Sequence, residues 1–199
     1  MHSIQPLLDK NAAILPNSVC SIPNSEVHLP VPIEKAKFVR QYRIPEVFKP
    51  MVDMQVQKWK SKGVVVSAPP GCKFNNPLTT APKKDPVTGQ VDSKTRRICL
   101  DPRAFNPLLP DDHFSLPLIE DIFAALKGAV IFSSLDIEDA YPRLSIYPPD
   151  RPVTAFMHRG EHLMFARAIY GIKHMSSHFQ RIVTSALQPF NSFCLVFVD

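Results

Sequence analysis

The amino-acid sequence predicts an α+β chain, in which helices and short β-strands alternate. Apolar residues recur at helical spacing in some segments, and short apolar runs with the length of strands lie between them. The expected helices are 45–62, 117–127 and a stretch from Met175 onward; the expected strands are 63–67, 129–136 and 194–199, with a two-stranded hairpin at 77–101. Because 45% of the 199 residues are hydrophobic, such a chain can bury a core.

The first expected helix, 45–62, has clear signals at both ends. Its apolar face consists of Phe48, Val52, Val56 and Trp59. Gly63 follows where a helix terminator is expected, and Pro50 must lie in the first turn or bend the helix. The next residues, "GVVVS" at 63–67, are predicted to form a short strand, followed by a loop rich in turn formers.

The other two helices are predicted from the same spacing. Pro117 opens the second helix and Gly128 closes it. Its apolar face consists of Ile119, Ile122, Phe123 and Leu126. The third has an apolar stripe formed by Met175, Phe179, Ile182, Val183, Ala186 and Leu187. We interpret this stripe as a core-facing surface.

Prolines separate a loose beginning from a more regular remainder. Residues 1–33 contain Pro6, Pro16, Pro23, Pro30 and Pro32 and show no sustained hydrophobic period. The sequence therefore predicts an extended, proline-containing arm over 1–33 and a folded domain over 34–199.

Composition narrows the class of protein only slightly. A net charge of +5 favours a polyanionic partner, although many proteins without such a partner share this value. No apolar run approaches the roughly 20 residues of a membrane span, and the start lacks a secretory signal. We therefore expect an intracellular chain, cytoplasmic or nuclear and not secreted. The four cysteines, Cys20, Cys72, Cys99 and Cys194, are too widely spaced for a zinc motif, and free thiols are expected.

The hairpin at 77–101 is rich in cations near its turn. These are Lys83, Lys84, Lys94, Arg96 and Arg97. A basic hairpin is suited to contact phosphate, but a solvated loop explains the same charges equally well.

Two apolar runs, "AVIFSSLD" and "CLVFVD", each finish on an acid, Asp136 and Asp199. If the two strands are neighbours, both carboxylates lie at one end of a sheet, where they repel each other unless a cation separates them. Hard oxygen ligands suit Mg²⁺, and two such ions about 3.5–4 Å apart serve phosphoryl transfer. Acids at sheet edges are common, however, so this spacing alone favours a structural role.

The residues between and around the two acids resemble a known family. In order, the chain contains "KWKSKGVV", "APKKD", "RRICLDPRAFN", "SLPLIEDIFAALKGAVIFSSLDIEDAY", "DRPVTAF", "IYGI", "HFQRIV" and "FVD". These blocks resemble the reverse transcriptase of gypsy-type long-terminal-repeat retrotransposons and, more distantly, that of retroviruses. The resemblance runs from about His28 to Asp199. It implies the fingers and part of the palm of a right-hand polymerase, with an antiparallel palm sheet and packed helices and without the thumb.

The resemblance also implies a metal site. Asp136 matches the first metal-binding carboxylate, followed by Ile137, whose backbone would also face the metal. Asp199 matches the first acid of the aromatic-x-Asp-Asp turn, with Phe197 in the aromatic place. The expected cofactors are two Mg²⁺ ions, with Mn²⁺ possible, and the expected reaction is nucleotidyl transfer from a dNTP to a primer 3′-OH.

The same resemblance assigns a nucleotide site. Tyr141, after Ala140, matches the aromatic residue under the incoming sugar, where a rigid ring would exclude a ribose 2′-OH. The alternative interpretation of Tyr141 is an ordinary tyrosine of the core. Lys83 and Arg97 match the residues that contact the triphosphate, with Lys84 as the alternative to Lys83. Tyr170 and Gly171 match the turn that lies beside the nucleotide. Template or primer contacts match Arg103, Asn106 and Gln180. Asp101 is expected to be structural, and a helical glutamine is often just solvated.

Several positions depart from the family. "IYGI" replaces Pro-Phe-Gly-Leu, Pro142 follows Tyr141 and removes a backbone N–H, and Val153 stands where lysine is frequent. The match also ends before the second acid, and the thumb, connection and ribonuclease H segments are expected only in a fuller polyprotein. We therefore expect little polymerase activity from the chain alone. The alternatives are a non-catalytic remnant that binds nucleic acid weakly and, remotely, an unrelated basic fold.

Overall fold

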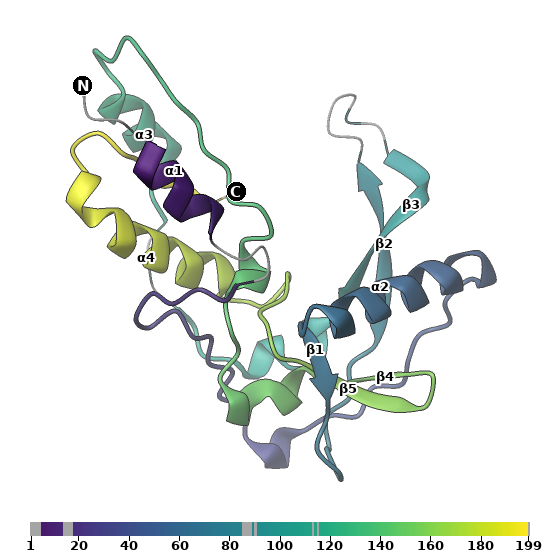
Figure 1. Ribbon diagram of the computed structural model, residues 1–199. Helices are drawn as coiled ribbons and strands as arrows, with labels where there is room; N and C mark the ends of the chain where they lie inside the picture. Colours follow the sequence, from purple (N-terminus) through teal and green to yellow (C-terminus); the bar gives the residue numbers. More distant parts are fainter. Residues whose placement is uncertain are drawn as a thin grey trace.

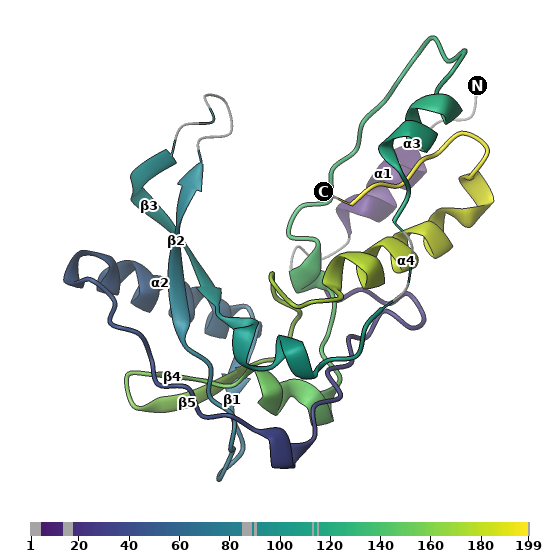
Figure 2. The ribbon, with the colours of Figure 1, turned by 180° about the vertical axis from the view of Figure 1, so that it is seen from behind.

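A computed structural model describes residues 5–13, 18–84, 89, 91–112, 114 and 116–198. The elements form two groups that diverge from a common base (Figure 1). One group contains helix α2 and the strands, and the other contains helices α1, α3 and α4 with both chain ends, as the view from behind also shows (Figure 2). Among the described residues, no helix is long and apolar enough to cross a membrane.

Helix α2 packs against a small antiparallel sheet. Helix α2 spans Lys49–Ser61 with Pro50 in its first turn, and Gly63 follows with φ +64°. The sheet has the order β1-β5-β4, with β1 Val65–Ser67, β4 Phe156–His158 and β5 Glu161–Phe165. Val65 pairs with Phe165, and Phe156 pairs with Leu163. The helix and the strand predicted over 45–67 are therefore confirmed.

The predicted hairpin is also present. Strands β2, Leu78–Lys84, and β3, Val91–Leu100, pair antiparallel from Leu78 opposite Leu100 outward, and the register shifts between Pro82 and Lys83. The turn itself falls mainly on residues 85–88 and 90, which lie outside the described residues.

The remaining helices are short, except for α4. Helix α1 spans Gln5–Ala12, α3 spans Ile119–Ala125 and α4 spans Met175–Leu187. The 3-10 helices are η1 Ile33–Lys35, η2 Glu46–Phe48, η3 Pro102–Ala104, η4 Asn106–Leu108, η5 Tyr141–Arg143, η6 Pro148–Thr154 and η7 Gln188–Phe190. Helix α3 confirms the predicted position, yet Ile119 and Phe123 on its apolar face are exposed.

The segment 1–33, predicted to be an extended arm, contains a helix and contributes residues to the core. Its first part contains α1, and Val27 and Leu29 are fully buried in the core. The backbone N–H of Val27 donates to the carbonyl of Ser145 at 2.8 Å, and the N–H of Tyr147 donates to the carbonyl of Val27 at 2.9 Å. Residues 25–29 thus lie beside residues 145–147, and the domain boundary at 33/34 stays a prediction.

Two predicted strands are wrong. Residues 129–137 and 194–198 form no regular secondary structure. Val130, Ile131 and Leu135 have 90%, 88% and 95% of their surface exposed. A strand is stable only when its backbone groups meet a partner strand, and neither segment has one among the described residues. The predicted palm sheet that would carry both acids is therefore absent from the described part of the chain.

Candidate functional site

Tyr141, the residue expected under the incoming sugar, is buried. It opens η5, only 8% of its surface is exposed, and its ring centroid lies 4.9 Å from Tyr170 and 5.6 Å from Phe179. Its hydroxyl is 3.1 Å from Oγ of Ser176 on α4. The ring is therefore held from two sides and at its polar end, a geometry suited to a fixed steric wall.

The turn at Tyr170 and Gly171 is fastened to the segment 102–106. Gly171 has φ +92°, and a Cβ there would lie 3.2 Å from Cγ of Pro102. Nδ2 of Asn106 donates to the carbonyl of Gly171 at 2.7 Å, and its Oδ1 accepts from the N–H of Lys173 at 3.1 Å. Asn106, expected to contact template, thus uses both ends of its amide to hold this turn.

Charges from two distant parts of the chain meet at Tyr170. Partial burial raises the pKa of the Tyr170 phenol, and the carboxylates of Asp139 and Asp136 raise it further. The guanidinium of Arg97 on β3 acts on the same pKa in the opposite direction. The structure therefore brings a hairpin cation and the acids of the 136–139 loop within electrostatic reach of one phenol.

The expected metal ligands lie in an exposed segment or outside the described residues. Asp136 and Ile137 lie in an exposed segment, Ala140 is half-buried, and Asp139 has φ +51°. Asp199 lies outside the described residues. Within the part of the chain that the structure describes, no group of three or more His, Cys, Asp or Glu side chains could hold a metal ion. The described residues alone do not form a complete metal site, although the carboxylate and carbonyl donors are of the type that Mg²⁺ prefers.

The hairpin cations differ in their surroundings. Arg96 places its guanidinium 4.5 Å from the ring centroid of Phe48, just before α2, whereas Arg97 is exposed. Lys83 is exposed at the register shift, and the side chain of its rival Lys84 lies outside the described residues. Arg96 thus packs against the fold, and Arg97 and Lys83 face solvent.

Arg103 belongs to a small polar cluster. Its Nε and Nη2 both donate to the carboxylate of the buried Asp101, at 2.9 Å and 2.6 Å. The hydroxyl of Tyr42 donates to the same carboxylate at 3.0 Å. These donors, led by Arg103, hold the pKa of Asp101 below its ordinary value. Asp101 is thus structural, as the sequence predicts, and it orients Arg103.

Gln180 does not face solvent. Only 3% of its surface is exposed, and Nε2 donates to the carbonyl of Val196 at 2.8 Å and to Oγ1 of Thr184 at 3.3 Å. Its Oε1 is buried without a partner among the described residues. In this structure the side chain that was expected on the template side is therefore held by the carbonyl of Val196.

Sequence reasoning missed Ser176 and Tyr42, and it treated Asp139 as an ordinary part of a motif. Ser176 meets Tyr141 across 35 positions, and Tyr42 meets Asp101 across 59. No local pattern marks such pairs, because only the fold brings them together.

The solved structures that this chain resembles define its fold. The chain is similar to the foamy viral protease-reverse transcriptase in complex with RNA/DNA hybrid, with a TM-score of 0.72 and 22% identity. The match covers 98% of this chain and 25% of that one. A second structure, that of the foamy viral protease-reverse transcriptase dRH in complex with double-stranded DNA, gives a TM-score of 0.69 and 19% identity over 98% of this chain and 34% of that one. The fold is therefore that of reverse transcriptases.

Sequence relatives specify the family. The chain is 31% identical over 159 residues to the retrovirus-related Pol polyprotein from transposon 412 of Drosophila melanogaster, which covers 78% of this chain. It is 28% identical over 149 residues, 74% of this chain, to that from transposon gypsy of the same organism. No protein-family model matches. The chain is therefore similar to one part of the retrovirus-related Pol polyproteins of gypsy-type retrotransposons, and it spans 12% and 14% of the length of these two relatives.

Proposed function

We propose that this chain is the nucleotide-binding fingers and partial palm of an RNA-directed DNA polymerase. The observation that carries the proposal is the fixed, buried ring of Tyr141, which lies 4.9 Å from the ring of Tyr170 and whose hydroxyl is 3.1 Å from Oγ of Ser176. Nucleotidyl transfer needs cations for the triphosphate beside acids for metal, and both Arg97 and the acids Asp136 and Asp139 act electrostatically on the phenol of Tyr170. The family relationship supports the same reading, since its members are Pol polyproteins.

The nucleotide would lie between the hairpin and η5. Lys83 and Arg97 are exposed and can bind the triphosphate oxygens, Arg97 as a bidentate donor. Tyr141, with Ala140 before it, would lie under the sugar, and the fixed ring would exclude a 2′-OH. Tyr170 and Gly171 would border the base, because a glycine there permits close approach of backbone.

Asp136, the backbone carbonyl of Ile137 and Asp199 are the proposed ligands of Mg²⁺, for which Mn²⁺ is a substitute. When bound, the divalent ions would supply charge neutralisation at the triphosphate and at the primer 3′-OH. Asp136 and Ile137 contribute oxygen donors from an exposed loop, so nucleotide and metal can reach them from solvent.

An RNA or DNA template-primer is the proposed partner. Arg103 reaches outward from its anchor on Asp101, with 79% of its side chain exposed, and is suited to contact phosphate. Asn106 is proposed to act at the same surface through the Gly171 turn that it holds. Gln180 would act there only after residues 194–198 move away from it.

A second candidate is a non-catalytic retroelement remnant that binds nucleic acid weakly through a basic surface. It is favoured by the exposed, irregular segment 129–137, which leaves Asp136 without a strand to support it. This candidate predicts binding that falls steeply with salt and does not respond to Mg²⁺ or to Asp136.

The test is binding of a labelled template-primer to the purified chain, with and without Mg²⁺ and the next complementary dNTP. We expect dNTP with Mg²⁺ to tighten binding of the wild type, and Asp136→Asn and Arg97→Ala to abolish this increment. Asp121→Asn, an exposed acid in the first turn of α3, is the matched control and should behave as the wild type. Equal, salt-dependent binding by all variants, without a dNTP effect, would favour the remnant.

A further inference from the structure

A small cavity of about 40 Å³ lies where the end of α2, the 3-10 helix η5 and the residues after β5 meet. Each of these three places contributes a cation to the lining: Lys62, Arg143 and Arg167. Asp139 is the acid among the charged lining residues, and Ser18 lies beside them. Cations from three separate parts of the chain thus line one cavity.

Backbone contacts fix the positions of both arginines. Ser145 and Arg167 pair in an antiparallel bridge, two residues after Arg143. The backbone N–H of Cys20 donates to the carbonyl of Arg143 at 2.7 Å, so the segment that begins at Ser18 runs beside the same residue. The cavity is therefore a product of the tertiary fold, because its lining residues are far apart in the sequence.

The two guanidinium groups are oriented by backbone carbonyls. Nε of Arg143 donates to the carbonyl of Glu138 at 3.3 Å, and Nη1 of Arg167 donates to the carbonyl of Pro142 at 3.5 Å. A guanidinium has five N–H donors, and a contact of this kind uses one of them. A carbonyl is also neutral, so it orients the guanidinium without cancelling its charge.

Placing these cations together is unfavourable unless an anion joins them. Lys62, Arg143 and Arg167 are all partly buried. Burial lowers the pKa of Arg167, and the charge of Arg143 lowers it further. Asp139 offsets one of the three positive charges. A bound anion would relieve the remaining repulsion.

The size and the charge of the cavity fit one phosphate group. A water molecule needs roughly 10–15 Å³ of cavity, so a cavity of about 40 Å³ has room for a small tetrahedral oxyanion and not for a nucleobase. Three positive charges against one negative charge leave +2 on the lining. A phosphate group carries about −1.5 to −2 near pH 7, and the fork of a guanidinium matches its oxygens.

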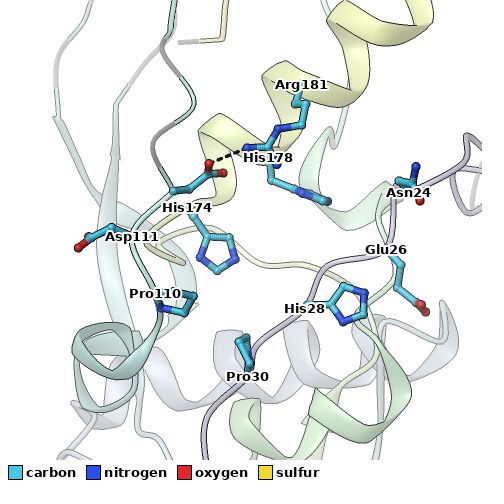
Figure 3. Close-up of a pocket in the computed structure, with 10 residues that line it drawn as sticks. Asn24, Glu26, His28, Pro30, Pro110, Asp111, His174, His178 and Arg181 are labelled. Atoms are coloured by element: carbon cyan, nitrogen blue, oxygen red, sulfur yellow. Dashed lines mark hydrogen bonds and ion pairs between the residues drawn. The ribbon is translucent and has the colours of Figure 1, made fainter.

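A larger cavity of about 550 Å³, between α4 and residues 24–30, has the opposite charge balance (Figure 3). Among the described residues that line it, the acids Glu26, Asp111 and Asp112 outnumber the cation Arg181. Asp112 also pairs with Arg181 at 2.6 Å, as Figure 3 shows. With neutral histidines this lining would repel phosphate, so charge and not volume selects the smaller cavity.

We propose that the cavity lined by Lys62, Arg143 and Arg167 binds one phosphate group. The group belongs either to a free ion, phosphate or pyrophosphate, or to the backbone of a nucleic acid, because both present the same oxygens. The two arginines donate hydrogen bonds to these oxygens, and Lys62 adds a positive charge. This inference does not rest on the proposed polymerase function, since neither Tyr141 nor the expected metal ligands take part.

The test is isothermal titration calorimetry of the full chain at pH 7.5 and constant chloride. The ligands are phosphate, pyrophosphate and a short oligothymidylate without terminal phosphates. We expect Arg143→Gln and Arg167→Gln to weaken binding about tenfold or more, because each loses a charge-assisted hydrogen bond. Lys58→Gln removes the same charge from an exposed lysine of α2 that does not line the cavity, so it should bind as the wild type does.

The oligonucleotide identifies the source of the phosphate. A loss of oligonucleotide affinity in the arginine variants assigns the site to a backbone phosphate, whereas a loss confined to the two small ligands assigns it to a free ion. Equal affinity of the wild type, both arginine variants and Lys58→Gln for all three ligands would overturn the inference.

If circular dichroism shows that the arginine variants do not fold, NMR of the wild type decides the matter. Phosphate should then shift the backbone amide signals of residues 142–144 and 166–168 at lower concentration than those of the rest of the chain. Shifts that leave these residues unaffected would contradict the proposed site.

Discussion

The sheet β1-β5-β4 and the segment 129–137 are both rich in β-branched and aromatic residues, yet only the first is a β-structure. Phe165 in β5 is 1% exposed and packs 5.1 Å from Trp59 and 5.3 Å from Phe156, ring centroid to centroid. Phe132 in the second segment is 61% exposed. The difference teaches that strand propensity acts only where a partner strand and a covering helix are available.

The largest expected effect is in the sheet. Phe165→Ala should lower the free energy of unfolding by about 3–5 kcal/mol, because it leaves a cavity between α2 and the sheet. Phe132→Ala, the same change at an exposed position, should stay within about 0.5 kcal/mol. Urea unfolding followed by circular dichroism measures both. A comparable loss for the two variants would show that 129–137 is packed in solution, which would contradict the comparison.

An intermediate effect on stability is expected at Asp101, whose carboxylate accepts hydrogen bonds from Arg103 and Tyr42. Asp101→Asn should reduce stability at pH 7 by about 1.5–3 kcal/mol, because charged hydrogen bonds from Arg103 and Tyr42 are lost or weakened.

The pKa of Asp101 lies below its ordinary value of 3.8 in the folded chain. Its contribution is therefore fully present well above that value and is lost as pH falls through the lowered folded pKa. The unfolding curves of the wild type and Asp101→Asn should converge in that acidic range. A stability difference that persists unchanged there would mean that packing, and not charge, sets the role of Asp101.

The smallest expected effect on stability comes from glycine substitutions, which separate the cost of backbone strain from the cost of steric crowding. Gly171 and Gly128 both have left-handed φ, at +92° and +88°, but only Gly171 faces Pro102 at 3.2 Å. Gly128→Ala should cost about 1–2 kcal/mol from φ alone. Gly171→Ala should cost the same plus the displacement of Pro102, so the difference between the two variants measures how tightly the segment 102–106 holds the Tyr170 turn. Equal losses would show that this contact is soft.

Local signals in the sequence were sufficient to predict elements whose hydrogen-bond partners lie nearby in the chain. Helix α2 has Pro50 in its first turn and ends before Gly63, and the β2–β3 hairpin pairs neighbouring segments, so both follow from nearby residues. The same information predicted strands at 129–136 and 194–199, where propensity was present and no partner was found in the described chain.

The sequence by itself determined the family, through blocks that occur in a specific order, and with it the residue types of the candidate site. Only the tertiary structure decided what those residues touch. Asn106 holds the Gly171 turn, Gln180 lies under residues 194–198, and Ser176 anchors Tyr141. The physical reason is range: capping, turn chemistry and periodicity act over a few residues, whereas these hydrogen bonds form between groups that only the folded core brings together.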